Sequence, residues 1–430
     1  MSLPVSRRIF SCFRTCRSLQ LVVRTVANGA TSTTRVTDTT RATDTGENTP
    51  SVKDRSERAT STPASDTMSA AVLKQFGSAL TVETIQQPKI LKSNEVLVDV
   101  HYCALNGIDV LISKNLHKCT QNPPFVLGFE VVGEIVELGD DASKNSYKVG
   151  DKVAVLNKER FGGLADRCIA EIGDVWKIPS NVKMLDAVCS LENYITSLIG
   201  LEKHADLEEE DMILINVGVG SIGLAAADLA ANVFRAKVIG VCATEDLATL
   251  VRERGAHAAL KYNDKKLMKH ISVVAAERNI KSIFADAEGA QFKKVLDRFT
   301  DIYKSKSLLT DMLRNDNFAV VVQHLSREGR VIVAGVAVTE VDPQLEPEKE
   351  SFSLSGISLQ KYRQKDHMLY RQYGEDVLQF LEEGLISPER SLIIGLSSIN
   401  DALETVAELK TPGKIVIDIK NKETKKDLKQ

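Results

Sequence analysis

Apolar and polar positions alternate in short runs between residues 70 and 176. Glu95–His101 alternates, residues 131–136 are rich in β-branched side chains, and a Gly-Asp turn in 149–155 precedes another strand. A period of two, interrupted by turn residues, is typical of strands that bury one face. The pattern predicts an all-β, barrel-like unit in this half of the chain.

A different rhythm begins at residue 212, where short apolar runs alternate with helical periods. The pattern predicts strands at 213–217, 237–242, 258–262, 282–286 and 330–335, and helices at 221–233, 246–254 and 265–278. Strands and helices that alternate at these lengths imply a parallel sheet built from right-handed crossovers. This half therefore predicts a doubly wound, nucleotide-binding α/β architecture.

One connection in this second half, between residues 286 and 330, is unusually long. Its apolar residues from Phe292 to Tyr303 fall at helical spacing, which predicts a helical insertion at 290–317. We expect this insertion to pack against the rest of the domain. A lid or a partner surface is the alternative.

The first 67 residues lack both patterns. Residues 1–37 contain six arginines and no acid, with apolar side chains between the arginines. This is typical of a mitochondrial transit peptide; a basic tail, or an extension before a start at Met68, is the alternative. Residues 31–67 hold 17 Ser or Thr among 37 positions and no aromatic, which predicts a disordered linker. We expect a mitochondrial matrix protein folded from about Met68, with a cytosolic form starting at Met68 as a second product.

The net charge differs between the N-terminal arm and the rest of the chain. The whole chain has a formal charge of −3 and a pI of about 6.2. The basic arm hides an acidic remainder, and this balance argues against a nucleic-acid binder. The most apolar stretch, Met212–Phe234, carries polar residues and glycines, so it predicts a buried strand and helix and no membrane span.

Gly218, Gly220 and Gly223 form the pattern G-x-G-x-x-G between a predicted strand and a predicted helix. In that context Gly218 permits a tight turn, Gly220 lets the backbone approach a pyrophosphate, and Gly223 allows close contact between helix and sheet. The helix start at Ser221 and Ile222 presents free N–H groups to phosphates. The loop predicts a dinucleotide site.

The end of the second strand decides which dinucleotide is favoured. NAD sites usually place Asp or Glu there, whereas residues 242–244 are Cys-Ala-Thr. Without a carboxylate a 2′-phosphate is tolerated, and the hydroxyls of Thr244 and Tyr262 are suited to donate hydrogen bonds to it. Glu245 and Asp246 follow closely and count against this interpretation. We predict NADPH as the cofactor.

Several motifs taken together resemble one known family. They are Val100–Asp109, Pro124–Gly133, Val149–Val153, the glycine loop, Asn232–Ile239, Glu328–Val333 and Gly413–Val416. From about residue 70 to 419 the chain resembles the zinc-free quinone oxidoreductase (ζ-crystallin-like) branch of the medium-chain dehydrogenases/reductases. The resemblance implies a GroES-like β-barrel catalytic domain at 68–195 with 360–420, a Rossmann domain at 196–359 and a flexible tail at 421–430.

The resemblance also implies site residues. Asn106 and Thr196 match positions beside the nicotinamide ring, with Tyr194 two residues earlier, and Gly335 follows a strand whose end lines the cofactor cleft. Alternatively, Tyr194 and Thr196 simply start a packed helix and Asn106 is a turn residue. His117 stands where relatives have tyrosine and is a candidate proton donor, because imidazole titrates near neutrality. A surface histidine without a role is the other interpretation.

No metal is predicted. Zinc-dependent relatives have cysteine at the position of Asn106 and histidine at that of Phe129, and neither asparagine nor phenylalanine is a good zinc ligand. The cysteines of the folded part are expected to be buried thiols, as suits a reducing compartment: Cys103, Cys119, Cys168, Cys189 and Cys242.

These features predict an NADPH-dependent, zinc-independent oxidoreductase that reduces quinones or other conjugated carbonyls by hydride transfer. Two alternatives stay open. A family lysine that holds the 2′-phosphate aligns with Leu247, which favours a catalytically weak NADP(H)-binding interaction or redox-sensing protein. His117 favours a trans-2-enoyl-thioester reductase. Relatives commonly dimerise through the last strand of the sheet, so Ser351–Leu359 implies a homodimer.

Overall fold

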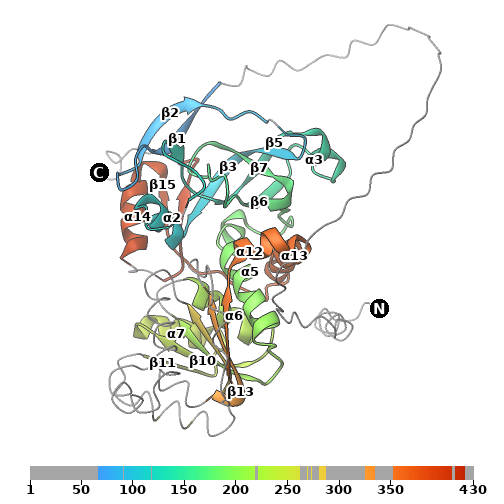
Figure 1. The fold of residues 1–430 in the computed structure, drawn as a ribbon, viewed down its shortest axis with the longest axis vertical. Coiled ribbons are helices and arrows are strands. Elements are labelled where there is room, and N and C mark those ends of the chain that lie inside the picture. The colour runs from blue at the N-terminus through green and yellow to red at the C-terminus, as the bar shows by residue number, and fades with distance from the viewer. Residues whose placement is uncertain are drawn as a thin grey trace, which may run out of the picture. The chain divides into compact units, whose positions relative to one another are not determined.

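The computed structural model describes residues 66–421, with gaps at 91, 118, 218–220, 262–279 except 269 and 273, 287–324, 335–351 and 409–411. All of the described residues lie in one unit of the chain. This unit consists of a barrel of mainly antiparallel strands, a parallel sheet, and helices between the two (Figure 1).

The barrel contains a seven-stranded and a three-stranded sheet. The larger has the order β15, β16, β3, β5, β6, β8, with β7 also paired to β3, and the smaller has the order β2, β1, β4. The strands are β1 (Thr67–Leu73), β2 (Thr81–Gln86), β3 (Glu95–Leu105), β4 (Phe125–Val126), β5 (Glu130–Leu138), β6 (Lys152–Leu156), β7 (Arg167–Glu171), β8 (Val175–Lys177), β15 (Arg390–Gly395) and β16 (Lys414–Asp418). Because β16 pairs with β3, a late segment of the sequence closes the sheet of an early one.

Short helices connect the barrel strands: α2 (Gly107–Ser113), α3 (Asp140–Lys144), the 3₁₀ turn η1 (Ile172–Asp174) and α4 (Met184–Ala187). A further 3₁₀ turn, η3 (Leu396–Ser398), leads into α14 (Ile399–Ala407), which packs on α2. Val96, Val98 and Val100 of β3 are fully buried, which explains the alternation seen in the sequence.

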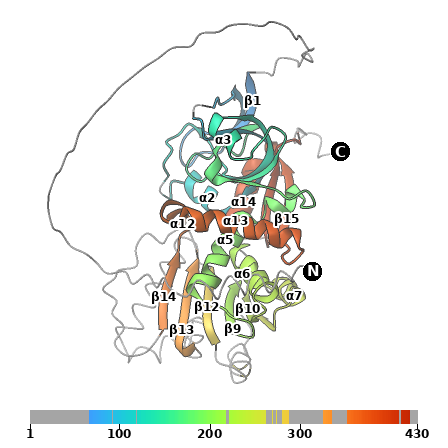
Figure 2. The same ribbon diagram turned by 90° about the vertical axis from the view of Figure 1, so that its right-hand side faces the viewer.

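The parallel sheet has six strands in the order β11, β10, β9, β12, β13, β14 (Figure 2). Their bounds are β9 (Met212–Val217), β10 (Lys237–Cys242), β11 (Ala258–Lys261), β12 (Ile280–Asp286), β13 (Leu325–Ala334) and β14 (Phe352–Ile357). Helices α6 (Ser221–Asn232) and α7 (Glu245–Glu253) pack on it. The order reverses between β9 and β12, and in doubly wound sheets ligands bind beside such a switch point.

Helices α5 (Leu191–Ile199), α12 (Leu359–Lys365) and α13 (His367–Glu382) lie between the barrel and the parallel sheet (Figure 2), and the π-helical turn η2 (Gly200–His204) follows α5 directly. The Arg363 guanidinium binds both carboxylate oxygens of Asp174, at 2.6 and 2.5 Å, and this pair attaches α12 to the barrel. The bidentate geometry suits a largely buried pair.

The predicted fold class, a GroES-like barrel with a Rossmann sheet, is confirmed. The observed strands and helices match the predicted ones to within a few residues, apart from β13, which begins at Leu325 rather than at 330. The predicted terminal strand Ser351–Leu359 corresponds to β14, at one edge of the sheet. The predicted arm and linker up to residue 65, the insertion at 290–317 and most of the helix at 265–278 lie outside the described residues.

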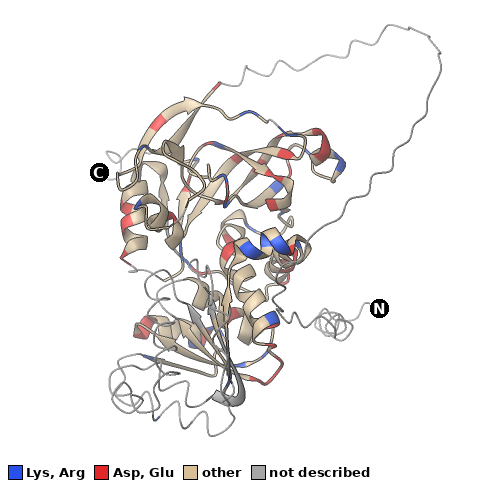
Figure 3. Cartoon of the chain, viewed as in Figure 1, with Lys and Arg blue, Asp and Glu red and all other residues tan. Residues whose placement is uncertain are grey.

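Charged side chains of both signs are distributed over the barrel and the helices, and α12 stands out as a basic segment (Figure 3). Within the described ranges, we find no helix with the length and apolar character needed to cross a bilayer.

Candidate active site

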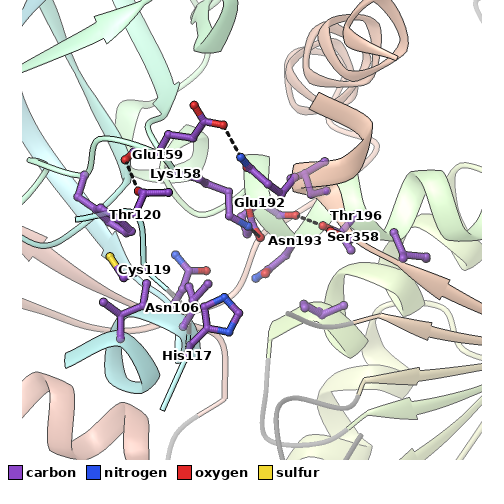
Figure 4. Close-up of a pocket in the computed structure, with 17 residues that line it drawn as sticks. Asn106, His117, Cys119, Thr120, Lys158, Glu159, Glu192, Asn193, Thr196 and Ser358 are labelled. Carbon is purple, nitrogen blue, oxygen red and sulfur yellow. Dashed lines mark hydrogen bonds and ion pairs between the residues drawn. The ribbon is translucent and has the colours of Figure 1, made fainter. Parts of the chain in front are cut away.

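A cavity of about 150 Å³ lies where the barrel, α5 and the parallel sheet meet (Figure 4). Its barrel side includes Asn106 and His117, its α5 side includes Asn193 and Thr196, and its sheet side includes Ile222 at the start of α6. Three predicted catalytic residues, Asn106, His117 and Thr196, therefore share one cavity. Ile222, predicted to bind the cofactor, lines it too.

Asn106 precedes α2 and is held from three directions. Its backbone N–H donates to Asp109 Oδ2 at 2.9 Å, and its side-chain Nδ2 donates to Glu130 Oε2 at 3.0 Å. Its side-chain Oδ1 accepts a hydrogen bond from Lys414 Nζ. The Asn106 amide is thus committed to the protein interior rather than to the open space of the cavity.

Glu130 connects these contacts. Its Oε2 accepts from Lys414 Nζ at 2.8 Å, and its Oε1 accepts from the backbone N–H of Glu192 at the start of α5, at 2.9 Å. Lys414 and Glu130 are each only 1% exposed. A buried carboxylate with a cation and further donors avoids the cost of an unpaired buried charge, so β5, β16 and α5 meet in one satisfied network.

Asp109 lies beside this network without a cation of its own. Its Oδ1 has no hydrogen-bond partner among the described residues. Burial raises the pKa of Asp109 from 3.8 to about 7, against the opposing effect of its hydrogen bond from Asn106. Burial also raises the pKa of the neighbouring Cys103 thiol well above its ordinary value.

The α5 side of the cavity is less completely paired. Thr196 Oγ1 donates to the backbone oxygen of Glu192 at 2.7 Å, as expected for a helical threonine. Lys158 Nζ lies 2.5 Å from Glu192 Oε1 and 5.2 Å from the centre of the Phe129 ring. Glu192 Oε2 and Asn193 Nδ2 have no hydrogen-bond partner among the described residues.

His117 is half-buried at the mouth of this space (Figure 4). Burial, with a smaller contribution from the charge of Lys158, lowers the pKa of His117 from 6.5. His117 thus lines the cavity, and its role as a proton donor, against a surface histidine without a role, stays a prediction. Cys119, expected to be buried, is only partly so: it lines the cavity, and its Sγ accepts from the Gln121 N–H. Cys103, Cys168, Cys189 and Cys242 are buried, as predicted.

Tyr194 does not line the described cavity. It is 3% exposed, and its hydroxyl donates to Asp228 Oδ2 on α6 at 2.6 Å. Neighbouring positions of a helix point about 100° apart, so Tyr194 faces α6 while Asn193 and Thr196 face the cavity. The same Asp228 oxygen accepts from the Ser387 N–H at 2.8 Å. Tyr194 thus joins α5, α6 and the segment that returns to the barrel.

The start of α6 packs closely on β9. A Cβ on Gly223 would lie 2.7 Å from the Asn216 backbone oxygen, so only glycine permits this close contact of helix and strand. Ser221 is the first residue of α6. The loop residues Gly218 and Gly220, together with Tyr262 and Gly335, lie outside the described residues, so their predicted roles stay predictions.

Thr244 follows β10 and caps α7, where its Oγ1 accepts from the Leu247 N–H at 3.2 Å. Leu247, at the position of the family lysine, is buried. Lys261 at the end of β11 pairs in register with Cys242. Its Nζ lies 3.3 Å from Glu245, which also binds Arg252 at 2.7 Å.

This arrangement changes how Glu245 is interpreted. Two cations face its carboxylate and lower the pKa of Glu245. The acid that counted against a 2′-phosphate is thus balanced locally, and Lys261 is a cation that sequence reasoning overlooked. Its position directly before Tyr262 was the available signal.

Comparisons with known proteins agree with this geometry. Residues 92–180 match the alcohol dehydrogenase GroES-like domain. The chain is 27% identical over 354 residues to the mouse (Mus musculus) quinone oxidoreductase-like protein 2, covering 82% of this chain and 92% of that protein. It is 29% identical to the quinone oxidoreductase-like protein 2 homolog of Nematostella vectensis, covering 82% and 89%. The chain is therefore similar to quinone oxidoreductase-like proteins over most of its length, in agreement with the resemblance to the zinc-free medium-chain dehydrogenases/reductases.

Solved structures support the same fold. The quinone oxidoreductase from Thermus thermophilus, also solved in complex with NADPH, aligns with a TM-score of 0.62 at 19% identity, covering 82% of this chain and all of that one. The CurK enoyl reductase aligns with a TM-score of 0.67 at 20% identity, covering 82% and 99%.

The resemblance places the question of a metal at Asn106 and Phe129. The amide of Asn106 is bonded to Glu130 and Lys414, and the ring of Phe129 is fully buried. The described part of the chain contains no cluster of three or more His, Cys, Asp or Glu side chains placed to hold a metal. That the enzyme works without zinc stays a prediction.

Sequence reasoning missed four residues around the cavity: Lys158, Glu192, Asn193 and Lys414. Asn193 and Thr196 are three positions apart, a spacing that places both on one side of a helix, and this signal was available. Lys414 lies within a motif that carried the family resemblance. Its contact with Asn106 spans 308 positions, which no local pattern indicates.

Proposed function

We propose that the cavity is the active site of an NADPH-dependent, zinc-independent oxidoreductase that reduces quinones or other conjugated carbonyls. The observation that carries this proposal is the single cavity lined both by the start of α6 and by polar groups of the barrel and α5. This arrangement brings a nucleotide-binding turn and an acceptor site together. The similarity to quinone oxidoreductases supports the chemistry.

The residues present fit the proposed cofactor. The helix start at Ser221 and Ile222, set close to β9 by Gly223, would hold the pyrophosphate. Thr244 and Lys261 would hold the 2′-phosphate, since the nearby Glu245 carboxylate is balanced by two cations. Bound NADPH supplies a hydride, and the protein contributes orientation, exclusion of water and a proton.

Within the cavity, Thr196 would support the face of the nicotinamide ring, and His117 would supply a proton to the acceptor. The committed amide of Asn106 gives this residue a different role from the one expected. We propose that it fixes the shape of the cavity floor and positions the start of α2, rather than polarising the acceptor directly.

The first experiment is a fluorescence titration of the full-length protein with NADPH and NADH. We expect tighter binding of NADPH, followed by NADPH oxidation when 1,4-benzoquinone or 2-cyclohexen-1-one is added. Lys261→Ala should weaken NADPH binding about tenfold and leave NADH binding unchanged, since one charge-assisted contact contributes about 1.5–3 kcal/mol. Lys237→Ala is the matched control. Lys237 begins β10, at the end of that strand away from Cys242 and Lys261, and its Nζ lies 3.1 Å from Glu210.

NADPH binding without oxidation by any acceptor of a broad panel would contradict the proposed reaction. It would favour the alternative of a nucleotide-binding interaction or redox-sensing protein.

A second candidate function is reduction of trans-2-enoyl thioesters. The position of His117 in the cavity favours it, and the fold likeness to the CurK enoyl reductase is compatible with it. It predicts activity on trans-2-butenoyl thioesters that is lost in His117→Ala. Equal activity of that variant on such thioesters would argue against a proton-donating histidine.

Assembly and location complete the proposal. β14 lies at the edge of the parallel sheet, and pairing of two such edges would give a homodimer. Sedimentation as a monomer would exclude that dimer.

The arginine-rich arm would direct the protein to the mitochondrial matrix, and a tagged full-length protein that stays in the cytosol would contradict this.

A further inference from the structure

The cavity contains one buried donor for which the proposed function has no use. Asn193 is only 3% exposed, and its Nδ2 has no hydrogen-bond partner among the described residues. Burying an amide donor without a partner costs about 1–3 kcal/mol, so such a group calls for an explanation. A ligand that accepts a hydrogen bond in the cavity supplies one.

Several other donors of the cavity are already engaged. Asn106 Nδ2 donates to Glu130, and Thr196 Oγ1 donates to the backbone of Glu192. Lys158 is paired with Glu192. Thr120 Oγ1 donates to the backbone of Glu159, and Gln360 Nε2 donates to its side chain at 2.6 Å. Asn193 Nδ2 is thus the fully buried donor of this cavity that lacks a partner among the described residues.

The direction of this donor is favourable. Asn193 precedes Thr196 by three positions on α5, and its amide is turned toward the space in front of Asn106 and the His117 imidazole (Figure 4). Two groups suited to act on an acceptor oxygen, one hydrogen-bond donor and one proton donor, thus face the same space from opposite elements.

The remaining walls limit what the donor can bind. Ile108, Ile112, Phe161, Ile222 and Ile357 give the cavity apolar surfaces beside its polar end. Apolar walls beside one unpaired donor match a conjugated molecule that carries a carbonyl oxygen.

We propose that Asn193 selects the acceptor, by donating a hydrogen bond from Nδ2 to the carbonyl oxygen of an enone or quinone. This inference rests on the proposed function. In the reduction the acceptor takes a hydride from the reduced nicotinamide and a proton from protonated His117. The electron pair of the conjugated system moves onto the oxygen held by Asn193. The donor acts most strongly on that developing charge, so it lowers the barrier as well as binding the substrate.

The test compares Asn193→Leu and Asn193→Asp with the unchanged protein. Both variants keep the approximate size of the side chain and remove the donor. With 2-cyclohexen-1-one and 1,4-benzoquinone, we expect kcat/KM to fall at least about 30-fold, mostly in kcat, because loss of one oxyanion donor commonly costs a factor of 10²–10³. NADPH affinity, measured by fluorescence, should stay unchanged. Asn181→Leu, at an exposed asparagine outside the cavity, is the control.

A second readout needs no turnover. Cyclohexanone has the oxygen but no conjugated double bond, and its binding in the presence of NADP⁺ is measured by calorimetry. We expect binding to the unchanged protein that is lost in Asn193→Leu. If acceptor reduction and cyclohexanone binding both survive in the variants within threefold, the inference is overturned while the proposed function stands. If the unchanged protein reduces nothing but its cyclohexanone binding depends on Asn193, the ligand site stands and the proposed function fails.

Discussion

The barrel side and the α5 side of the cavity treat an asparagine in opposite ways. On the barrel side, Asn106 is bonded to Glu130 and Lys414, so its amide has no donor to spare. On the α5 side, Asn193 is just as buried but keeps an open Nδ2. The difference teaches that a residue type does not define a role. A saturated amide stiffens the cavity, whereas an open one is suited to meet a ligand.

The largest expected effect comes from removing Lys414, the cation that binds Asn106 and Glu130 on the barrel side. Lys414→Met leaves Glu130 buried without its partner charge, and we expect a loss of about 3–5 kcal/mol in the free energy of unfolding. Chemical denaturation measures it. Lys420→Met removes an exposed lysine paired with Asp99 and should cost less than about 1 kcal/mol. Equal losses in the two variants would show that the buried network contributes no special stability.

On the barrel side, the buried Asp109 makes the free energy of unfolding depend on pH. Burial raises its pKa from 3.8 to about 7, so between these values the folded state keeps a proton that the unfolded state has lost. Stability should therefore fall as pH rises across this window, by up to about 1.4 kcal/mol per pH unit. Above about pH 7 the contribution becomes constant.

Asp109→Asn should remove this dependence, because the amide does not titrate. Denaturation midpoints between pH 5 and 8 measure the difference between the variant and the unchanged protein. Parallel pH profiles for the two proteins would contradict the raised pKa.

The smallest expected effect is a shift in the pH dependence of acceptor reduction, which tests the role of His117. Since burial and Lys158 lower the pKa of His117, acceptor reduction should fall with rising pH around a midpoint below 6.5. Lys158→Met removes a positive charge from the vicinity of the imidazole, so the midpoint should move upward by on the order of half a pH unit. Lys74→Met, an exposed lysine paired with Glu83, should leave the midpoint in place. A downward movement in Lys158→Met would refute this electrostatic assignment.

Much of the fold follows from local pattern. The alternating runs around Val96 and Val100 predicted barrel strands, and the rhythm of strands and helices from Met212 predicted the parallel sheet. Each of these signals depends on residues near in sequence, whose periods are set by strand and helix geometry. That residues 360–420 belong with the barrel was expected only from family resemblance, and the pairing of β16 with β3 was not predicted, because pairing between distant segments leaves little local trace.

At the site, too, single residues were predictable from the sequence but their distant contacts were not. Asn106, His117 and Thr196 were found from the sequence, but the partners that define their roles were not. On α5, Tyr194 points toward Asp228 and Asn193 points into the cavity. A sequence pattern that is wrong by one residue about which face of α5 meets the cavity would exchange these two side chains. Lys414 was beyond reach because a buried ion pair between β5 and β16 is set by the folded topology alone.

The pairing of β16 with β3 also orders events during synthesis. The barrel strands that carry Asn106 and Glu130 leave the ribosome early, whereas Lys414 is among the last described residues to be made. Until then Glu130 lacks its cation and β3 has an open edge, so the cavity floor cannot form on the nascent chain. A product that stops short of Lys414 would carry a buried, unpaired acid into a barrel it cannot close, and we expect cellular proteases to remove it.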